Sequence, residues 1–232
     1  MTTEPDADRN RTARRAGLLY LLMLPLGVFG IVYVPTALIV RGDATETAER
    51  IAASEWLFRS GIVSHLLSQV VFVFLVLALF QLLQAVNERH ARLMVILALL
   101  GVPAAMLSEL GHLAALSLLD APAGGPLTPA QLHAQAMTFL DLRTQGVLIA
   151  QIFWGLWLLP LGVLVYRSGF IPRAIGVLLM IAGVGYFFDS MTQLLAPGFP
   201  VVSLFTFVGE LALASWLVIR GAGTGRRPAV LT

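Results

Sequence analysis

Two ionisable side chains lie three residues apart in the apolar stretch SELGHLAALSLL, at residues 108–119. Residues at this spacing share one face of a helix, so Glu109 and His112 are neighbours if the stretch is helical. Helical bundles that hold two metal ions use the same Glu-x-x-His spacing, but they need it twice, together with further carboxylates. Here it occurs once within an apolar stretch, and the HExxH pattern is absent. The chemistry open to the pair therefore depends on the side chains that neighbouring elements bring to it.

The composition is that of an integral membrane protein. Of the 232 residues, 58% are hydrophobic and 12% are charged, with a mean hydropathy of +0.85; soluble domains are about 45–50% apolar and about 25% charged. The chain has no cysteine, which excludes disulfides, thiolate nucleophiles and cysteine-ligated metals. All 15 basic residues are arginine, which excludes lysine Schiff-base chemistry and the lysine-containing phosphate-binding loop. The apolar composition predicts the lipid bilayer as the partner. The small net charge of +2 is carried at the chain ends and in loops, which indicates membrane orientation and no nucleic-acid partner.

Six segments are long and apolar enough to cross a bilayer, which takes about 20 helical residues. They predict an all-α fold, an integral membrane bundle of six transmembrane helices near residues 17–39, 57–84, 93–119, 146–166, 174–194 and 200–219. We expect one membrane domain over residues 14–221, with polar cytoplasmic tails at 1–13 and 222–232.

The arginines are distributed unequally between the two sides of the predicted bundle. Cytoplasmic loops of membrane proteins carry an excess of Lys and Arg. With the N-terminus inside, the inner side holds Arg9, Arg11, Arg14, Arg15, Arg89, Arg92, Arg167, Arg173, Arg220, Arg226 and Arg227. The outer side holds only Arg41, Arg50, Arg59 and Arg143. This bias predicts that both termini are cytoplasmic.

Two outer connections predict helices of their own. In the first, Asp43 and Glu46 have the spacing of a capping box before a short amphipathic run. In the second, Thr128 is an expected N-cap, with Pro129 at the first helical position and Gln131 three residues after the cap. The second helix either lies at the outer interface or extends the fourth span. The tryptophans and tyrosines are expected to contact lipid or to mark the interfaces.

Polar side chains recur on the predicted spans at helical spacing, where they normally face the bundle. Because buried carboxyl and imidazole groups need partners, we expect His65 and His112 to pair with Glu109. By helical rise, these residues, Gln151 and Asp189 lie at a similar height in the outer half of the bilayer, with Glu210 closer to the inner side. The candidate ligand-binding residues are Asp189, Glu210, Glu109, His112, His65, Gln69 and Gln151.

Four interpretations of these polar groups are open. They serve as interhelical hydrogen bonds in a non-enzymatic bundle, or they bind a small ligand, an ion or a proton. A membrane-embedded metal-dependent enzyme or redox protein would use Glu109, His112, His65 and Asp189, and its metal ligands would be His65, Glu109 and His112. A haem held between His65 and His112 is the fourth interpretation. We expect no cofactor and favour the non-enzymatic interpretations, structural or ligand-binding.

A family resemblance is carried by four separated blocks: ARRAGLLYLL, GDATETAERIAASEWLFRSG, YRSGFIPRAIGVLLMIAGVGYFFDS and GELALASWLVIRG. In this order, from about Arg14 to Gly221, they resemble the bacterial multi-pass membrane family called domain of unknown function 4386. The resemblance implies six spans in the bacterial plasma (inner) membrane and no established activity.

The resemblance also carries over individual positions. They are Arg59, Gly61, Tyr166, Arg167, Ser168, Gly169, Pro172, Arg173, Tyr186, Asp189, Gly209 and Glu210. The family pattern does not require a histidine at the positions of His65 or His112. The resemblance therefore favours Asp189 and Glu210 over a metal or haem site.

Overall fold

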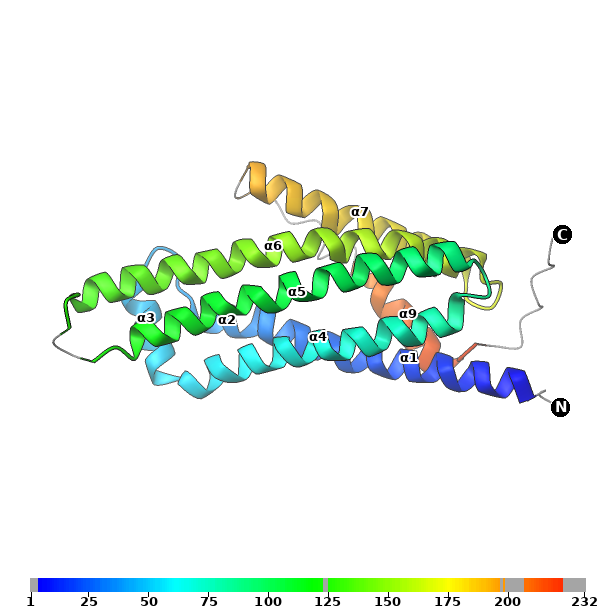
Figure 1. Cartoon of the computed structure of the whole chain (residues 1–232), viewed down its shortest axis with the longest axis horizontal. Helices are drawn as coiled ribbons and strands as arrows, with labels where there is room; N and C mark the ends of the chain where they lie inside the picture. The colour runs from blue at the N-terminus through cyan, green and yellow to red at the C-terminus, as the bar shows by residue number, and fades with distance from the viewer. Residues whose placement is uncertain (1–3, 123–124, 197, 199–206, 223–232) are drawn as a thin grey trace. The chain divides into compact units, whose positions relative to one another are not determined.

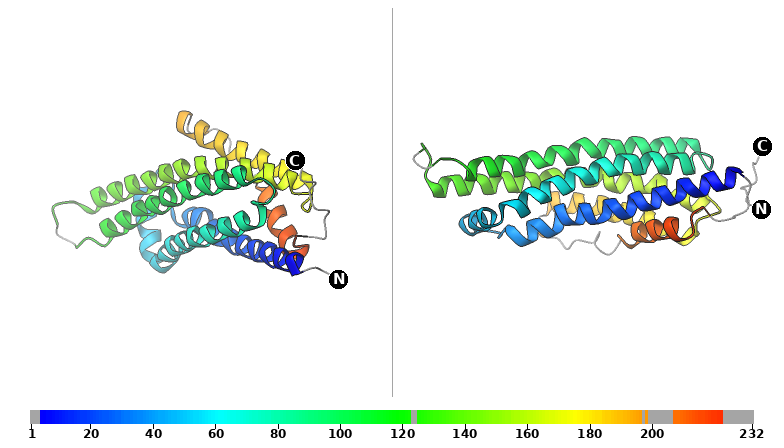
Figure 2. Two further views of the ribbon diagram at one scale, coloured as in Figure 1. Left: turned by 45° about the vertical axis from the view of Figure 1, so that its right-hand side comes forward. Right: turned by 90° about the horizontal axis from the view of Figure 1, so that it is seen from below.

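The computed structural model describes residues 4–122, 125–196, 198 and 207–222, and these residues form helices joined by short connections (Figure 1 and Figure 2). No strand occurs within these ranges, so the all-α prediction is confirmed. In chain order the helices are α1 (Glu4–Val28), the π-helical η1 (Phe29–Tyr33), α2 (Val34–Leu38), α3 (Ala44–Ala53), α4 (Glu55–Leu83), α5 (Glu88–Leu119), α6 (Pro129–Arg167), α7 (Arg173–Leu195) and α9 (Val208–Ile219).

Five helical stretches are long and apolar enough to cross a membrane. The first is the continuous run Ala7–Leu38 through α1, η1 and α2, and the others are α4, α5, α6 and α7. These five cover the first five predicted spans, and they mark the chain as a multi-pass membrane protein. The apolar α9 has 12 residues. The start of the predicted sixth span, residues 200–206, lies outside the described residues, as do residues 223–232 of the expected C-terminal tail.

Helix ends follow the capping signals in the sequence. Asp43 accepts a hydrogen bond from the Glu46 backbone N–H at 2.9 Å and begins α3. At α6, the Thr128 hydroxyl accepts from the Gln131 backbone N–H at 3.3 Å, and the Gln131 side chain accepts from the Thr128 backbone N–H at 2.8 Å. Helix α6 then runs 39 residues without interruption, so the expected outer helix is an extension of the fourth span. Helix α1 begins at Glu4, inside the segment expected as a polar tail.

The chain divides into two compact units, each built from separate stretches of sequence. Unit 1 comprises residues 1–22, 71–102 and 148–232, and unit 2 comprises residues 23–70 and 103–147. Helices α1, α4, α5 and α6 each contribute one part to unit 1 and another to unit 2. Each unit is described by itself below.

In unit 1, helices α6 and α7 approach each other closely at pairs of glycines. A Cβ built on Gly155 would lie 2.6 Å from the Gly183 carbonyl oxygen, and one on Gly162 would lie 2.7 Å from the Gly176 carbonyl oxygen. Small residues at such positions let helix backbones pack in membranes, where no hydrophobic effect drives helix pairing. The turn between these helices contains Gly169 at φ +75°, a conformation that glycine adopts without strain. The turn and the glycine pairs together hold α7 against α6.

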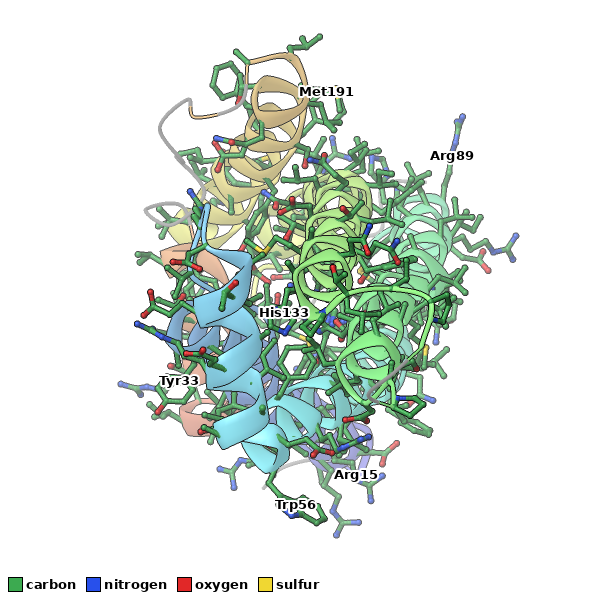
Figure 3. All side chains as sticks on the ribbon, turned by 90° about the vertical axis from the view of Figure 1, so that its left-hand side faces the viewer. Arg15, Tyr33, Trp56, Arg89, His133 and Met191 are labelled. Atoms are coloured by element: carbon green, nitrogen blue, oxygen red, sulfur yellow. The ribbon has the colours of Figure 1, made fainter. Side chains whose placement is uncertain are left out.

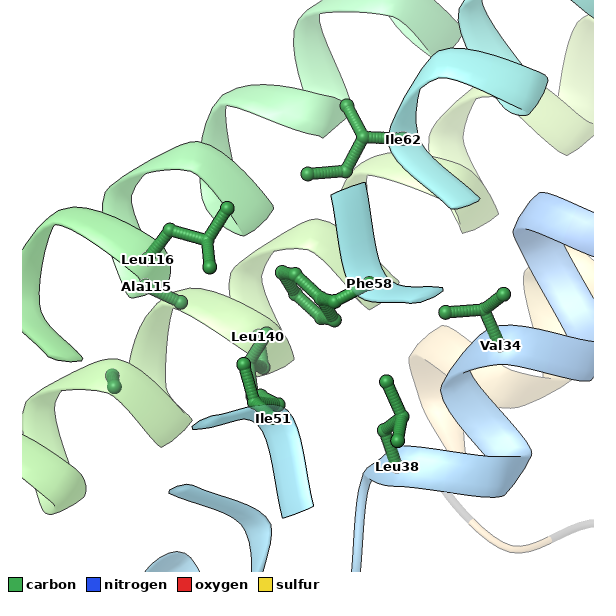
Figure 4. Close-up of a cluster of buried hydrophobic side chains, with 9 residues drawn as sticks. Val34, Leu38, Ile51, Phe58, Ile62, Ala115, Leu116 and Leu140 are labelled. Carbon is green, nitrogen blue, oxygen red and sulfur yellow. The ribbon is translucent and has the colours of Figure 1, made fainter. Parts of the chain in front are cut away.

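Unit 2 has an apolar core where η1, α2 and α3 meet the unit 2 parts of α4, α5 and α6 (Figure 4). Its buried members are Val34, Leu38, Ile51, Phe58, Ile62, Ala115, Leu116, Ala136 and Leu140. By contrast, Trp56 at the start of α4 is 85% exposed and points away from the ribbon (Figure 3). An exposed indole at a helix start matches the interfacial position expected for tryptophan.

Candidate functional site

Glu109 is the centre of a buried polar cluster in unit 2. Its side chain is 1% exposed. Its Oε1 lies 2.6 Å from Nδ1 of His65 on α4, and its Oε2 lies 2.7 Å from Nδ1 of His112, one turn further along α5. The structure therefore brings together the three residues that the sequence pattern paired.

Arg143 is a fourth member of this cluster that the sequence interpretation missed. It was expected on the outer side as a topology-setting arginine, but the structure shows it 4% exposed. Its Nη2 and Nε lie 3.0 and 3.2 Å from Glu109 Oε1. The length of α6 is the feature that could have predicted this burial. In a helix that begins at Pro129, Arg143 lies about 21 Å from the start and so within the bundle.

Arg143 also donates to the backbone carbonyl of Gly30, at 3.3 Å from Nη2. The π-helical turn explains why this carbonyl needs a partner. The Val34 N–H donates to the Phe29 carbonyl, five residues back, so it does not serve Gly30. The next residue is Pro35, which has no N–H. A backbone acceptor left over by the helix ladder is thus satisfied by a buried guanidinium.

The close approach of η1 to α4 depends on Gly30 itself. A Cβ at this position would lie 2.5 Å from the Gly61 carbonyl oxygen and 2.9 Å from the His65 backbone nitrogen. This close approach lets the Gly30 carbonyl contact Arg143 while the His65 imidazole contacts Glu109. One carboxylate and one guanidinium link segments of α4, α5, α6 and η1 within unit 2.

Partner chemistry fixes the protonation pattern of this cluster. A guanidinium is always charged and only donates hydrogen bonds, so Arg143 holds Glu109 as an accepting carboxylate. Both imidazole Nδ1 atoms must then carry a hydrogen. The Nε2 atom of His112 is buried and has no hydrogen-bond partner within the described ranges. The ring of Phe58 lies edge-on to this imidazole, with centroids 4.8 Å apart.

The other unit 2 candidate is Gln69 on α4, which is 5% exposed. Its Nε2 lies 3.3 Å from the Ser68 hydroxyl, and its buried Oε1 has no hydrogen-bond partner among the residues that the structure describes. Gln69 makes no hydrogen bond to Glu109, His65 or His112 in this part of the chain. We therefore treat it as a neighbour of the Glu109 cluster and not as one of its members.

Glu210, in α9, is the centre of a second buried cluster, in unit 1. Its side chain is 6% exposed. The Tyr20 hydroxyl donates to Oε2 at 2.8 Å, and the Tyr186 hydroxyl donates to Oε1 at 2.9 Å. In the described part of unit 1, no arginine or histidine nitrogen lies within ion-pair distance of Glu210. Two phenols therefore hold this carboxyl group without a cationic side chain.

Tyr20 corrects the expectation that the tyrosines and tryptophans contact lipid or mark interfaces. It is fully buried, and its ring lies 6.4 Å from that of Trp157, which is 2% exposed. Trp157 in turn packs edge-on to Phe72 at 5.0 Å. This aromatic layer fixes the Tyr20 hydroxyl so that it points at Glu210. No local sequence pattern predicts this orientation, because the partner of Tyr20 is Glu210, on a helix far along the chain.

Asp189 and Gln151 are the remaining predicted site residues, and both lie in unit 1. Asp189 is 1% exposed and follows Tyr186 by one turn on α7. The Gln151 side-chain amide lies 3.4 Å from the Tyr186 carbonyl oxygen. The predicted candidates thus fall into two sets, with Glu210, Asp189 and Gln151 in unit 1 and the four others in unit 2.

Neither set forms a three-ligand metal centre. Among the described residues, no group of three or more His, Asp or Glu side chains is placed to hold a metal ion. In unit 2 the reason is visible, since both Glu109 oxygens face imidazole or guanidinium hydrogens. The metal ligand set His65, Glu109 and His112 stays a prediction. The expectation that the protein uses no cofactor stays a prediction.

Comparison with known proteins places both clusters inside one family model. The model described as domain of unknown function DUF4386 matches residues 15–221. The chain belongs to this family. An uncharacterised protein of Archaeoglobus fulgidus is 42% identical over 74 residues, which are 32% of this chain and 44% of that protein. The chain thus spans less than half the length of that relative. No solved structure matches this chain significantly.

The DUF4386 match covers every residue of the Glu109 and Glu210 clusters. Its description assigns no activity to either. The two buried carboxyl groups are therefore the features of this DUF4386 protein that bear most directly on its function.

Proposed function

We propose that this DUF4386 protein is a non-enzymatic, six-span protein of the bacterial plasma membrane that binds a small monovalent cation at Glu210. Both termini would be cytoplasmic, with residues 200–219 as the sixth span. The arginine bias supports this orientation, and the burial of Arg143 strengthens it by removing one arginine from the outer surface.

The observation that carries the proposal is a buried carboxyl group without a cationic partner. Glu210 accepts from Tyr20 and Tyr186, and no cationic side chain neutralises it in the described part of the chain. An ionised carboxylate is costly in a low-dielectric interior unless it is paired, coordinated or protonated. Phenol hydroxyls stabilise the charge by hydrogen bonding but do not neutralise it. A bound cation, a proton included, would complete the site.

Glu109 supports the same proposal by contrast. Its charge is already balanced by Arg143, and its two oxygens are occupied by side-chain donors. We therefore assign Glu109, His65 and His112 a structural role in holding unit 2 together, with Arg143 as the fourth member. Ion binding is assigned to Glu210, with Asp189 and Gln151 as its neighbours through Tyr186.

Topology can be tested directly because the chain has no cysteine. Single cysteines introduced near Arg11, Gly42, His90, Gly125 and Thr224 would be labelled in intact cells with a membrane-impermeant maleimide. We expect labelling of the second and fourth positions only. Labelling of a terminal cysteine from outside would contradict the orientation.

Cation binding can be tested through the two site phenols. The ultraviolet difference spectrum of tyrosine, recorded in lipid nanodiscs, would be followed during separate titrations with acid, Li⁺, Na⁺ and K⁺. We expect a saturable change with at least one cation that is lost in Glu210→Gln and retained in Glu88→Gln, an exposed glutamate of unit 1. Tyr33→Phe is the matched aromatic control, because Tyr33 is 56% exposed and points outward (Figure 3). Equal responses in the wild type and Glu210→Gln would refute the proposal.

A second candidate function, the metal-dependent enzyme or redox protein, is favoured by one observation. His112 donates from Nδ1 to a carboxylate and leaves a buried Nε2 without a hydrogen bond among the described residues. Imidazole ligands of metals commonly have this carboxylate support on their other nitrogen. Asp189, which this candidate also uses, belongs to unit 1 and not to unit 2.

Elemental analysis and a visible spectrum of the purified protein would decide this second candidate. Stoichiometric metal or a haem band that is lost in His112→Ala but kept in His90→Ala would support it. His90 is a suitable control because it is only half-buried and is bonded to Asn87. A colourless, metal-free protein would leave His112 as part of the structural cluster.

A further inference from the structure

We propose that the cation bound at Glu210 is a proton, exchanged without any change in the hydrogen-bonding partners of the carboxyl group. This inference rests on the proposed ion-binding function and names its ligand. It is carried by the identity of the two partners, Tyr20 and Tyr186, and by their positions, one on each carboxyl oxygen.

A phenol can both donate and accept a hydrogen bond. When Glu210 is ionised, Tyr20 and Tyr186 both donate to it. When a proton adds to one carboxyl oxygen, that O–H donates to the adjacent phenol oxygen, whose hydrogen rotates away, while the other phenol still donates. In both states each carboxyl oxygen thus keeps a hydrogen bond to its phenol, with the heavy atoms in the same places. The site stores one proton without breaking the link between α1, α7 and α9.

The ligand count disfavours a larger cation at this site. In proteins Ca²⁺ takes about six to eight oxygen ligands and Mg²⁺ takes an octahedral set of about six. Among the described residues, the hydrogen-bonded side-chain oxygens at this site are the two of Glu210 and the two phenol oxygens, and each phenol hydrogen is directed at the carboxyl group. No group of three acidic or imidazole side chains that could hold a metal ion occurs among the described residues. A metal ion would have to displace hydrogens that already occupy the oxygens.

The groups that face Glu210 also favour proton uptake over a permanent charge. Helix α1 contributes Tyr20, and α7 contributes Tyr186 with Asp189 one turn away. From α6 come Trp157, which packs on Tyr20, and the amide of Gln151, and both are uncharged. The described residues around Glu210 therefore supply hydrogen bonds but no cationic side chain, and a proton would neutralise the carboxylate.

Infrared spectroscopy of the full chain in lipid nanodiscs tests the inference. A protonated carboxylic acid has a carbonyl stretching band that a carboxylate lacks, and this band shifts in deuterated water. We expect a component of this band at acidic pH, isolated as the difference between the wild type and Glu210→Gln, that disappears as the pH is raised. Glu210→Gln should remove it. Asp189→Asn and Glu109→Gln should retain it, because the band belongs to neither carboxyl group.

The tyrosines provide a readout that a purely structural role would not move. Removing one hydrogen bond from the acid should displace the carbonyl band in Tyr186→Phe and in Tyr20→Phe, and Tyr33→Phe should leave it in place. Helicity by circular dichroism confirms that each variant is folded. If Glu210→Gln is not folded, a band that is displaced in Tyr186→Phe and Tyr20→Phe but not in Tyr33→Phe assigns the protonated acid to Glu210 instead.

The outcomes separate the inference from the function on which it rests. A pH-dependent band that depends on Glu210 supports both. If Na⁺ or K⁺ changes the tyrosine spectrum at constant pH and no carbonyl band appears, ion binding stands and the proton assignment fails. If no cation changes either signal, both fail. A band that survives in Glu210→Gln and is lost in Asp189→Asn overturns the proton site at Glu210.

Discussion

The two buried glutamates of this protein differ in the kind of partner each has. Glu109 in unit 2 is held by a guanidinium and two imidazole nitrogens, whereas Glu210 in unit 1 is held by two phenols. A guanidinium only donates and always carries charge, so it locks its carboxylate in one state. A phenol donates or accepts and carries no charge, so it accommodates two states. Burial alone therefore does not tell a structural carboxyl group from an exchangeable one; the partners do.

The largest expected effect is that of removing the locked charge. Arg143→Met leaves Glu109 buried without its counter-ion and the Gly30 carbonyl without its donor. Breaking one half of a buried ion pair destabilises by about 3–5 kcal/mol. The free energy of unfolding in bicelles, measured by detergent titration, should fall by that amount, whereas Arg59→Met at an exposed pair should change it by less than about 1 kcal/mol.

The double variant Glu109→Met/Arg143→Met checks the cause. Replacing both members of a buried pair by apolar groups is often neutral. The double variant should thus be more stable than Arg143→Met alone. A double variant less stable than the single one would mean that Arg143 acts mainly by packing and not through charge.

A smaller effect is expected from adding a methyl group where η1 packs against α4, next to the Glu109 cluster. In Gly30→Ala the added Cβ would press on the Gly61 carbonyl and force η1 away from α4. Overpacking of this kind typically costs about 1–3 kcal/mol. Gly27→Ala is the matched control on the same helical run, because its Cβ would meet only the Ser68 hydroxyl oxygen at 4.0 Å. Equal unfolding free energies for the two variants would contradict the contact.

The phenols of Glu210 should show a penalty that depends on pH. Tyr20→Phe removes a hydrogen bond whose strength is about 1.5–3 kcal/mol to a charged group and about 0.5–1.5 kcal/mol to a neutral one. If Glu210 takes up a proton, the stability lost in Tyr20→Phe should be smaller at acidic pH, where the carboxyl group is neutral, than at alkaline pH. The unfolding free energies of wild type and variant, compared across pH, provide the measurement. A penalty independent of pH would mean that Glu210 stays in one protonation state.

Much of this architecture follows from local sequence signals. Helix positions follow apolar length, and the caps at Asp43 and Thr128 follow side chains that reach backbone groups three residues on. The pairing of Glu109 with His65 and His112 could also be predicted, because intramembrane polar groups on neighbouring helices have few other partners.

The partners that distinguish the two glutamates could not be predicted in this way. The excess of arginine expected in cytoplasmic loops predicts Arg143 at the outer surface. The side chain is buried instead because α6 continues without interruption from Pro129 to Arg167. Tyr20 and Glu210 lie 190 positions apart in the chain, so their pairing depends on the packing of α1 beside α9. Height along a helix, the basis of the predicted polar layer, says nothing about which lateral neighbours two residues have.

The smallest expected effect concerns the backbone acceptor that Arg143 satisfies. Pro35→Ala supplies an N–H five residues after Gly30, which is the donor position that continues a π-helical ladder. The Gly30 carbonyl would then have a second donor, and Arg143 would serve Glu109 alone. We expect the free energy of unfolding to change by less than about 1 kcal/mol in Pro35→Ala, and we expect Arg143→Met to destabilise this background less than it destabilises the wild type. The coupling free energy is obtained from the wild type, the two single variants and the double variant. It measures how much of the stabilisation by Arg143 comes from its hydrogen bond to the Gly30 carbonyl. A coupling of zero would mean that Arg143 stabilises the protein through Glu109 alone.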